Sequence, residues 1–139
     1  GALIFWLIRR HVQESRYEHE EDTRYSDTCR QIQQCIYENL TSKNISPSFI
    51  SDRTGFDIKK INSTVQKEAQ CPVYYLVLKT RIKKAKQMLS QKDMSFIQIS
   101  EAVGFNDVTD FRKKFNLVTK TTPELFHKRK MIEIEEESE

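Results

Sequence analysis

The sequence predicts an all-α fold in which two helix-turn-helix units are joined by a linker helix, about seven helices in all, preceded by a charged helical stem. Three observations predict it. The 139 residues include only 3 glycines and 3 prolines, too few for a turn-rich β architecture. Apolar residues recur at spacings of three and four, as they do on amphipathic helices. Finally, one glycine-turn motif occurs twice, in a chain long enough for one domain core with an attached helix or tail.

Residues 1–27 are interpreted as an apolar segment followed by a charged stem. Residues 2–8 are continuously apolar and precede Arg9 and Arg10, which resembles the cytoplasmic end of a membrane span. Seven residues cannot cross a bilayer, which takes about 20. Two interpretations therefore stay open: the end of a membrane-embedded sensor region upstream in the same polypeptide, or an amphiphilic helix end that packs on the domain or, in a homodimer, on a second copy. Because the sequence starts with Gly rather than Met, we expect a piece of a longer chain.

The first unit is predicted to begin with an amphipathic helix from about residue 28 to 41. Ile32, Ile36 and Leu40 recur at a spacing of four, and Cys29 extends the same stripe by one turn. This apolar face must cover elements that follow in the chain.

A short helix follows, and a glycine turn separates it from the next. Ser46 and Pro47 suit its start, because serine accepts a hydrogen bond from a free main-chain amide and proline has no amide to leave unpaired. Gly55 is expected to end it, since glycine takes a positive φ without strain. The next helix is predicted over residues 58–68.

A longer linker helix is predicted over residues 73–91, because Pro72 breaks the preceding helix. Its candidate core positions are Tyr75, Leu76, Ile82, Ala85 and Leu89. A basic face of the same helix is expected to carry Lys79, Arg81, Lys83, Lys84 and Lys86.

The most informative pattern is a repeat, in which the form Ile-Ser-acid-x-x-Gly-Phe occurs at residues 50–56 and again 49 residues later. After each Gly-Phe pair, a helix is predicted with two inward anchors four residues apart. The anchor pairs are Ile61 with Val65 and Phe111 with Phe115. Helix, glycine turn and second helix, occurring twice, indicate duplicated helix-turn-helix units. Thr122 and Pro123 start a final helix, and the phenylalanines near the turns are expected in the core rather than as stacking platforms for single strands.

Charge is segregated along the chain. Residues 41–130 carry 18 Lys and Arg against 8 Asp and Glu, a net charge of +10, whereas the flanks carry 5 against 12, a net charge of −7. A basic block of this kind is typical of a polyanion-binding protein, although a solvated lysine-rich surface would look the same. Three cysteines without ligand spacing indicate reduced thiols, with Cys29 and Cys71 packed, in a reducing compartment.

These residues resemble the AraC/XylS family over roughly residues 32–129. The second unit carries the more specific pattern, Ile97-x-Ile99-Ser-x-x-Val103-Gly104-Phe105-x-Asp107-x-x-x-Phe111-x-x-x-Phe115, followed by Thr122-Pro123-x-x-Phe126. Residues 76–89 resemble the family's linker helix. The resemblance implies the DNA-binding output domain of a cytoplasmic bacterial transcription regulator, with double-stranded DNA and RNA polymerase as partners and no cofactor.

The sequence departs from the family pattern at several positions. Gln70 and Lys120 stand where the family usually has glycine, and Val65 stands where phenylalanine is common. The first unit offers Asn62 and Ser63, and no arginine, on its predicted reading helix. These departures bear on the sequence specificity of the first unit.

The second helix of such a unit enters the major groove with its N-terminal residues on base edges. The base-reading candidates are Lys59, Lys60, Asn62 and Ser63 in the first unit and Val108, Thr109, Arg112 and Lys113 in the second. The cationic groups can donate to guanine, asparagine can pair with adenine, and valine or threonine can touch a thymine methyl. Each of these residues could instead be an ordinary exposed helix position.

Other residues are candidates for phosphate contacts, which fix the register without reading sequence. They are Ser46, Lys67, Lys79, Lys83, Ser95 and Lys114. Asp110 is ambiguous: it could read a cytosine amino group, orient Lys114 through an i, i+4 pair, or point away. Two reading helices on one linker should meet successive major grooves about 34 Å apart, with DNA bending if they lie closer.

The principal alternative is a degenerate helix-turn-helix interaction or dimerisation module of a membrane-linked signalling protein, with weak or no DNA binding. The unusual first reading helix and Asp110 favour it. An enzyme is not expected, because we find no paired carboxylates in an apolar setting, no Ser/His/Asp or Cys/His arrangement and no metal-ligand spacing. The domain is predicted over residues 28–130, with an acidic tail over residues 131–139.

Overall fold

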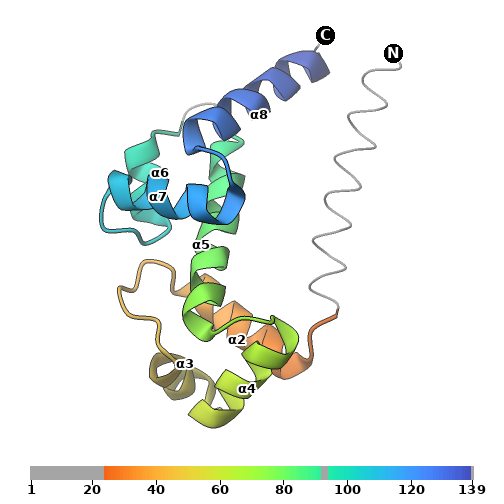
Figure 1. Ribbon diagram of the computed structural model, residues 1–139, viewed down its shortest axis with the longest axis vertical. Coiled ribbons are helices and arrows are strands. Elements are labelled where there is room, and N and C mark those ends of the chain that lie inside the picture. The colour runs from red at the N-terminus through yellow and green to blue at the C-terminus, as the bar shows by residue number, and fades with distance from the viewer. Residues whose placement is uncertain (1–23, 92–93, 139) are drawn as a thin grey trace.

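The computed structural model describes residues 24–91 and 94–138. The predicted apolar segment and nearly all of the stem, residues 1–23, lie outside the described residues. Seven helices and no strand occupy the described part (Figure 1), which confirms the all-α prediction. They are α2 (Asp27–Glu38), α3 (Pro47–Thr54), α4 (Ile58–Glu68), α5 (Val73–Leu89), α6 (Phe96–Ala102), α7 (Val108–Thr119) and α8 (Pro123–Ser138).

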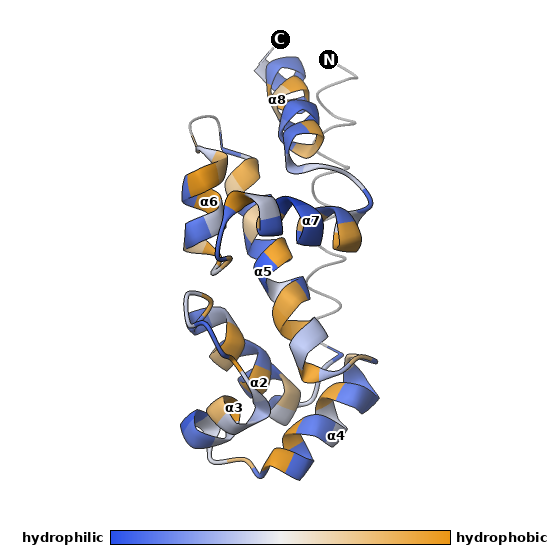
Figure 2. Ribbon diagram, turned by 60° about the vertical axis from the view of Figure 1, so that its left-hand side comes forward, coloured by the Kyte–Doolittle hydropathy of each residue, from blue (hydrophilic) through white to orange (hydrophobic). Residues whose placement is uncertain are grey.

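The helices form two halves that share α5 (Figures 1 and 2). α2, α3 and α4 pack together with the first part of α5, and α6, α7 and α8 pack along its second part. Each half therefore has its own hydrophobic core, to which α5 contributes Val73, Leu76 and Val77 in the first and Ile82, Ala85 and Leu89 in the second. Of the predicted core positions on α5, only Tyr75 is half-buried, at the edge of the first core.

The predicted phenylalanine core is present in both halves. Phe105, Phe111 and Phe115 are buried, with adjacent ring centroids 5.5–5.8 Å apart. Phe49, Phe56 and Phe126 are half-buried against the two cores. These rings stabilise the helix packing and are not free to stack on nucleic-acid bases.

The helix starts follow from local side-chain chemistry. The Ser46 hydroxyl accepts from the amide of Phe49 at 3.1 Å, and Pro47 follows it as the first helical residue. The Ser95 hydroxyl accepts from the amide of Gln98 at 3.0 Å, and the Gln98 side chain accepts from the Ser95 amide in return. Each such cap satisfies a main-chain donor that the first turn leaves unpaired.

Among the described residues, four turns adopt the left-handed conformation, and glycine occupies two of them. Gly55 has φ 79° and Gly104 has φ 93°, as their motifs predict. Gln70 has φ 58° and Lys120 has φ 64°. These are the two positions at which the sequence departs from the usual glycine of the AraC/XylS pattern. The turns are thus retained, at a conformational cost of about 1–2 kcal/mol each for a residue with a side chain.

The predicted boundary at residue 130 falls inside a helix. α8 continues without a break to Ser138, and in Figure 1 its C-terminal end extends past the other helices. The acidic stretch predicted as a tail is therefore the second half of α8. His127 attaches the first half of α8 to α5 and α6. Its Nδ1 donates to the carbonyl of Leu89 at 2.9 Å, and its ring packs edge-on against Phe96.

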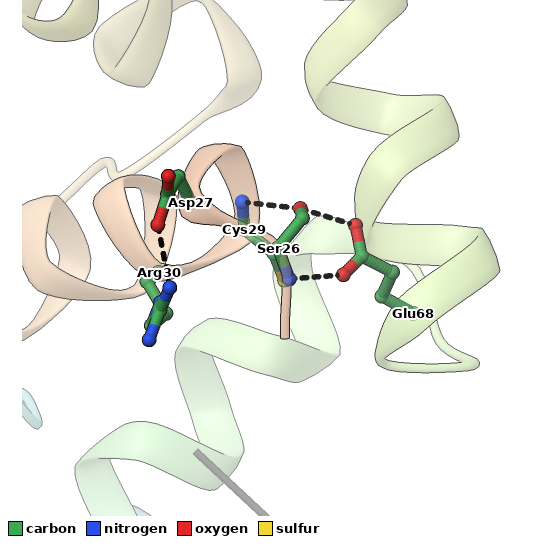
Figure 3. A network of polar contacts seen from close by, with 5 residues as sticks. All are labelled: Ser26, Asp27, Cys29, Arg30 and Glu68. Atoms are coloured by element: carbon green, nitrogen blue, oxygen red, sulfur yellow. Dashed lines mark hydrogen bonds and ion pairs between the residues drawn. The ribbon is translucent and has the colours of Figure 1, made fainter. Parts of the chain in front are cut away.

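The start of the domain is tied to the end of α4 (Figure 3). The Glu68 carboxylate accepts from both the main-chain amide and the hydroxyl of Ser26, at 2.6 and 2.7 Å. The same hydroxyl caps α2 by accepting from the amide of Cys29 at 3.2 Å. The hydrogen bonds from Ser26, the backbone one foremost, lower the pKa of Glu68 below its usual value.

Arg81 does not lie on an exposed basic face, contrary to the sequence prediction. Its guanidinium is half-buried and donates to two main-chain carbonyls, that of Ser42 at 2.9 Å and that of Gly104 at 3.3 Å. Burial lowers the pKa of Arg81, and the nearby carboxylate of Asp110 offsets part of that effect. Arg81 therefore joins the two halves of the molecule from within.

Candidate nucleic-acid interface

The outward face of α4 carries most of the base-reading candidates of the first unit. Ile61 and Val65 anchor the opposite face in the core, so the intervening side chains are directed away from it. Lys59, Asn62 and Ser63 line one shallow hollow of about 790 Å³ together with Ile58, Gln66 and Pro72. The structure thus brings three of the four candidates of this unit together on one surface.

Lys60, the fourth candidate on α4, lies to one side of that surface. Its ammonium group is placed over the ring of Phe56, 4.8 Å from the ring centroid. A cation–π contact of this kind at an exposed site is worth about 0.5–1 kcal/mol. Lys60 would have to leave the Phe56 ring in order to donate to a base.

The outward face of α7 has a corresponding arrangement. Phe111 and Phe115 hold the inner face in the second core, which leaves Thr109, Lys113 and Arg112 exposed. Val108 differs from the other candidates, because its side chain is half-buried against the core. Its methyl groups are therefore only partly available to a thymine.

Arg112 is paired with a residue of the last helix. Its Nε forms an ion pair with the carboxylate of Glu124 in the first turn of α8. Both side chains are about half exposed, 50% and 41%, and an exposed pair contributes little stability. The pair does orient the guanidinium, since it fixes the inner nitrogen and leaves the two terminal nitrogens for other acceptors.

Asp110 is directed toward the other half of the molecule rather than along the outward face. It lines a cleft of about 720 Å³ between the two halves, together with Arg81, Lys114, Tyr74 and Leu78. Burial lowers the pKa of Arg81, and the charge of Asp110 offsets part of that lowering. Asp110 was expected to read a cytosine, to orient Lys114 or to point away from the bases. Its position in the cleft agrees best with the last of these.

The phosphate candidates do not form one continuous set. Lys67 is exposed on α4, and Lys114 lines the cleft beside α7. Lys83 lines a different hollow, with Arg30, Gln33 and Tyr37 of α2. Lys79 is half-buried; burial raises the pKa of Cys71 in the first core, and the charge of Lys79 offsets part of that rise.

Ser46 and Ser95 both use their hydroxyl oxygens to cap helices, α3 and α6 respectively. In these caps the oxygen accepts and the hydroxyl proton is left to donate. A phosphate oxygen could therefore still accept from either residue.

The first turn of α5 and the residue before it lie between the hollow on α4 and the cleft beside α7. Pro72 borders the hollow on α4, and Tyr74 and Tyr75 border the cleft beside α7. Tyr74 is 74% exposed.

The described residues carry no sign of metal or thiol chemistry. Over residues 24–91 and 94–138, no group of three His, Cys, Asp or Glu side chains could hold a metal ion. Burial raises the pKa of Cys29 to about 11 and also raises the pKa of Cys35 and Cys71, so these thiols are weak nucleophiles at neutral pH. Nor does any helix in this part of the chain have the length and apolar character needed to span a bilayer.

Comparison with known protein families identifies the arrangement. A family model described as a helix-turn-helix domain matches residues 50–129, which is more than half of the chain. The chain belongs to this helix-turn-helix family. The match covers both glycine turns and both helices that follow them, so the duplicated unit predicted from the sequence is confirmed.

The relatives of this helix-turn-helix domain confirm its resemblance to AraC-type regulators. The transcriptional activator NphR of a Rhodococcus species is 25% identical over 107 residues, which are 77% of this chain and 32% of that protein. The chain thus spans about a third of the length of the curated relative that it matches.

Several solved structures share its fold. An AraC-type regulator from Chromobacterium violaceum has a TM-score of 0.63 at 17% identity, covering 76% of this chain and 96% of that one. The DNA-binding domain of AdpA, solved in complex with a target DNA, has a TM-score of 0.63 at 14% identity, covering 75% and 93%.

Two further residues of the helix-turn-helix domain share the faces of the predicted candidates. Gln66 lines the same hollow as Asn62, one turn further along α4, and Asn116 is exposed one turn beyond Arg112 and Lys113 on α7. Helical spacing is the signal that could have found them, because positions three or four residues apart share a face. Both carry amides, which can pair with adenine in two directions.

Proposed function

We propose that this domain is the sequence-specific, double-stranded DNA-binding part of an AraC-type transcription regulator, and that α4 and α7 enter successive major grooves. Membership in the helix-turn-helix family supports DNA as the partner. The residue-level assignment is supported by one observation in particular: after each glycine turn, a helix held by two core anchors turns ammonium, guanidinium and amide groups outward.

The two helices are suited to different bases. Arg112 and Lys113 on α7 can donate to guanine O6 and N7, whereas Asn62 and Gln66 on α4 can pair with adenine. We therefore propose that the second unit reads guanine and that the first unit reads adenine. Lys67 and Lys114 would contact phosphates and fix the register, without reading sequence.

The role of this chain in transcription is proposed from one relative. The relative NphR is named as a transcriptional activator, and by analogy we propose that this chain acts with RNA polymerase at promoters. A membrane-embedded sensor upstream and a homodimer through the stem remain predictions from residues 1–27.

A salt titration tests DNA binding itself. The chain is titrated against a random-sequence 40-base-pair duplex at 50 and 200 mM NaCl, with binding followed by mobility shift. About six phosphate contacts would make the affinity fall by about 10³-fold between these two concentrations. No binding at either concentration would contradict the proposal and favour the interaction-module alternative.

A selection experiment then tests specificity. Duplexes are selected from the random library by binding to the chain, over repeated rounds, and then sequenced. We expect two short conserved blocks about one helical turn apart, one rich in guanine and one rich in adenine. Enrichment without any conserved block would contradict sequence-specific reading.

A further inference from the structure

The two helix-turn-helix units touch each other directly, in addition to sharing α5. The contact consists of the segment after α2 in the first unit and the turn between α6 and α7 in the second. Arg81 stands between them and donates one terminal nitrogen to each, Nη2 to the Ser42 carbonyl at 2.9 Å and Nη1 to the Gly104 carbonyl at 3.3 Å. Next to this fork, Lys43 Nζ donates to Asn106 Oδ1 at 3.1 Å.

Gly104 allows this contact to form. A β-carbon at position 104 would overlap the main-chain carbonyl of Leu40 and would lie 3.2 Å from the guanidinium carbon of Arg81. Gly55, at the corresponding turn of the first unit, has nothing within 4 Å of the same position. Both glycines serve their turns through a positive φ, so the close approach is an additional requirement at Gly104 alone.

Arg81 differs from an exposed side-chain contact because its guanidinium is half-buried. Burying a guanidinium removes it from water, and the lowered pKa of Arg81 reflects that cost. Its two acceptors lie on segments 39 and 23 residues away in the chain, one in each unit. A rigid planar fork between two fixed carbonyls restrains the angle between the units as well as their separation.

We propose that Arg81 is a positioning residue for DNA recognition: by locking the two units at one mutual orientation, it sets the base-pair spacing at which both reading helices can bind together. This inference rests on the proposed function, since it assumes that α4 and α7 each read a half-site. Each inserted base pair rotates the second half-site by about 34–36° and moves it by about 3.4 Å. If the orientation of the two units is fixed, both reading helices cannot reach the displaced half-sites together, and affinity falls. If the units are joined only through α5, they can reorient and keep both contacts.

The test compares binding at different spacings. The probe is the duplex selected by the wild-type chain, together with versions carrying one or two base pairs inserted or removed between its conserved blocks. Wild type, Arg81→Met and Lys86→Met are titrated against each probe. Lys86 is exposed on α5, so its substitution removes one positive charge from the same helix without touching the contact.

We expect the wild type and Lys86→Met to lose about tenfold or more in affinity for each inserted base pair. Arg81→Met should bind the original spacing more weakly, and its loss per inserted base pair should fall below about threefold. The inference is overturned if Arg81→Met keeps the wild-type ratio between spacings. If the wild type selects no duplex at all, it is the proposed function that fails.

A second variant separates charge from geometry and covers the case in which Arg81→Met does not fold. Arg81→Lys keeps the positive charge but replaces the rigid planar fork with one ammonium nitrogen on a flexible stem. After far-UV circular dichroism has shown it to be folded, it should also lose discrimination between spacings while keeping the wild-type salt dependence. A wild-type spacing profile in Arg81→Lys would show that the fork does not set the spacing and would overturn the inference.

Discussion

Gly104 packs directly against the main-chain carbonyl of Leu40, so that the turn of the second helix-turn-helix unit contacts the segment after α2 in the first. The corresponding Gly55 faces open space. Two glycines that a repeat motif makes equivalent in sequence therefore have different surroundings in the fold, and substitutions should separate them.

Replacing the two glycines with alanine should destabilise the domain unequally. Both substitutions place a side chain at a positive φ, which costs about 1–2 kcal/mol. Gly104→Ala also forces Leu40 or α6 to move, and overpacking of this kind adds about 1–3 kcal/mol. Urea unfolding measures both free energies of unfolding. Equal decreases in the free energy of unfolding would show that the contact between Gly104 and Leu40 does not contribute to stability.

A substitution at Gln70 should stabilise the domain. Its φ of 58° is left-handed, where glycine is less strained than glutamine, so we expect Gln70→Gly to raise the free energy of unfolding by about 0.5–1 kcal/mol. Ala69→Gly is the control, because Ala69 has a right-handed φ of −92°. That change should destabilise the domain, and a loss of stability in Gln70→Gly would refute the explanation.

Lys113 and Lys67 should respond differently to truncation. Lys113→Ala removes a base contact, so it should cost about 1–3 kcal/mol on the selected duplex and relax the preference at one base position. Lys67→Ala removes a phosphate contact, so it should weaken all sequences evenly and reduce the salt slope by about 1. Affinity for a panel of single-base variants at two salt concentrations distinguishes these patterns. An even loss in Lys113→Ala would move that residue to the phosphate class.

The tie between Glu68 and Ser26 should make stability depend on pH. The pKa of Glu68 is lowered, so its contribution is present above the ordinary glutamate pKa and is lost as pH falls through the lower folded value. Thermal unfolding of Glu68→Gln should therefore show a lower Tm than wild type at pH 6 and a similar Tm at about pH 3. Glu101→Gln, at an exposed position on α6, serves as the matched control. A Tm difference for Glu68→Gln that is independent of pH would contradict this account.

The parts of the fold that sequence could predict are those with local signals. Serine before proline marked the start of α3, and glycine after each short helix marked the turns, because capping and positive φ depend on only a few neighbouring residues. The core anchors of α4 and α7 followed from spacing alone. On the reading helices, the same spacing identified Lys59, Asn62 and Lys113 as outward-facing.

Features that depend on distant contacts were missed. Arg81 was expected on an exposed face because its neighbours on α5 are basic, yet its acceptors are Ser42 and Gly104. The spacing of Val77, Arg81 and Ala85, four residues apart on one stripe, was the available signal. The ion pair of Arg112 with Glu124 likewise depends on tertiary packing. The contact of Lys60 with Phe56 joins residues four apart and was missed although it is local. The length of α8 was missed for another reason, since its run of glutamates predicted an acidic tail rather than a continuing helix.

Guanine N7 protection on the selected duplex tests the central claim, that both reading helices occupy major grooves. N7 lies in the major groove, so a bound helix shields it from methylation by dimethyl sulfate. We predict protection of the guanines in the block assigned to α7 and of guanines that flank the adenine-rich block assigned to α4, about one helical turn away on the same face of the duplex. Lys113→Ala should weaken the protection of the one guanine that Lys113 contacts and leave the other protected positions unchanged. A single protected patch, or methylation unchanged by saturating protein, would contradict the account.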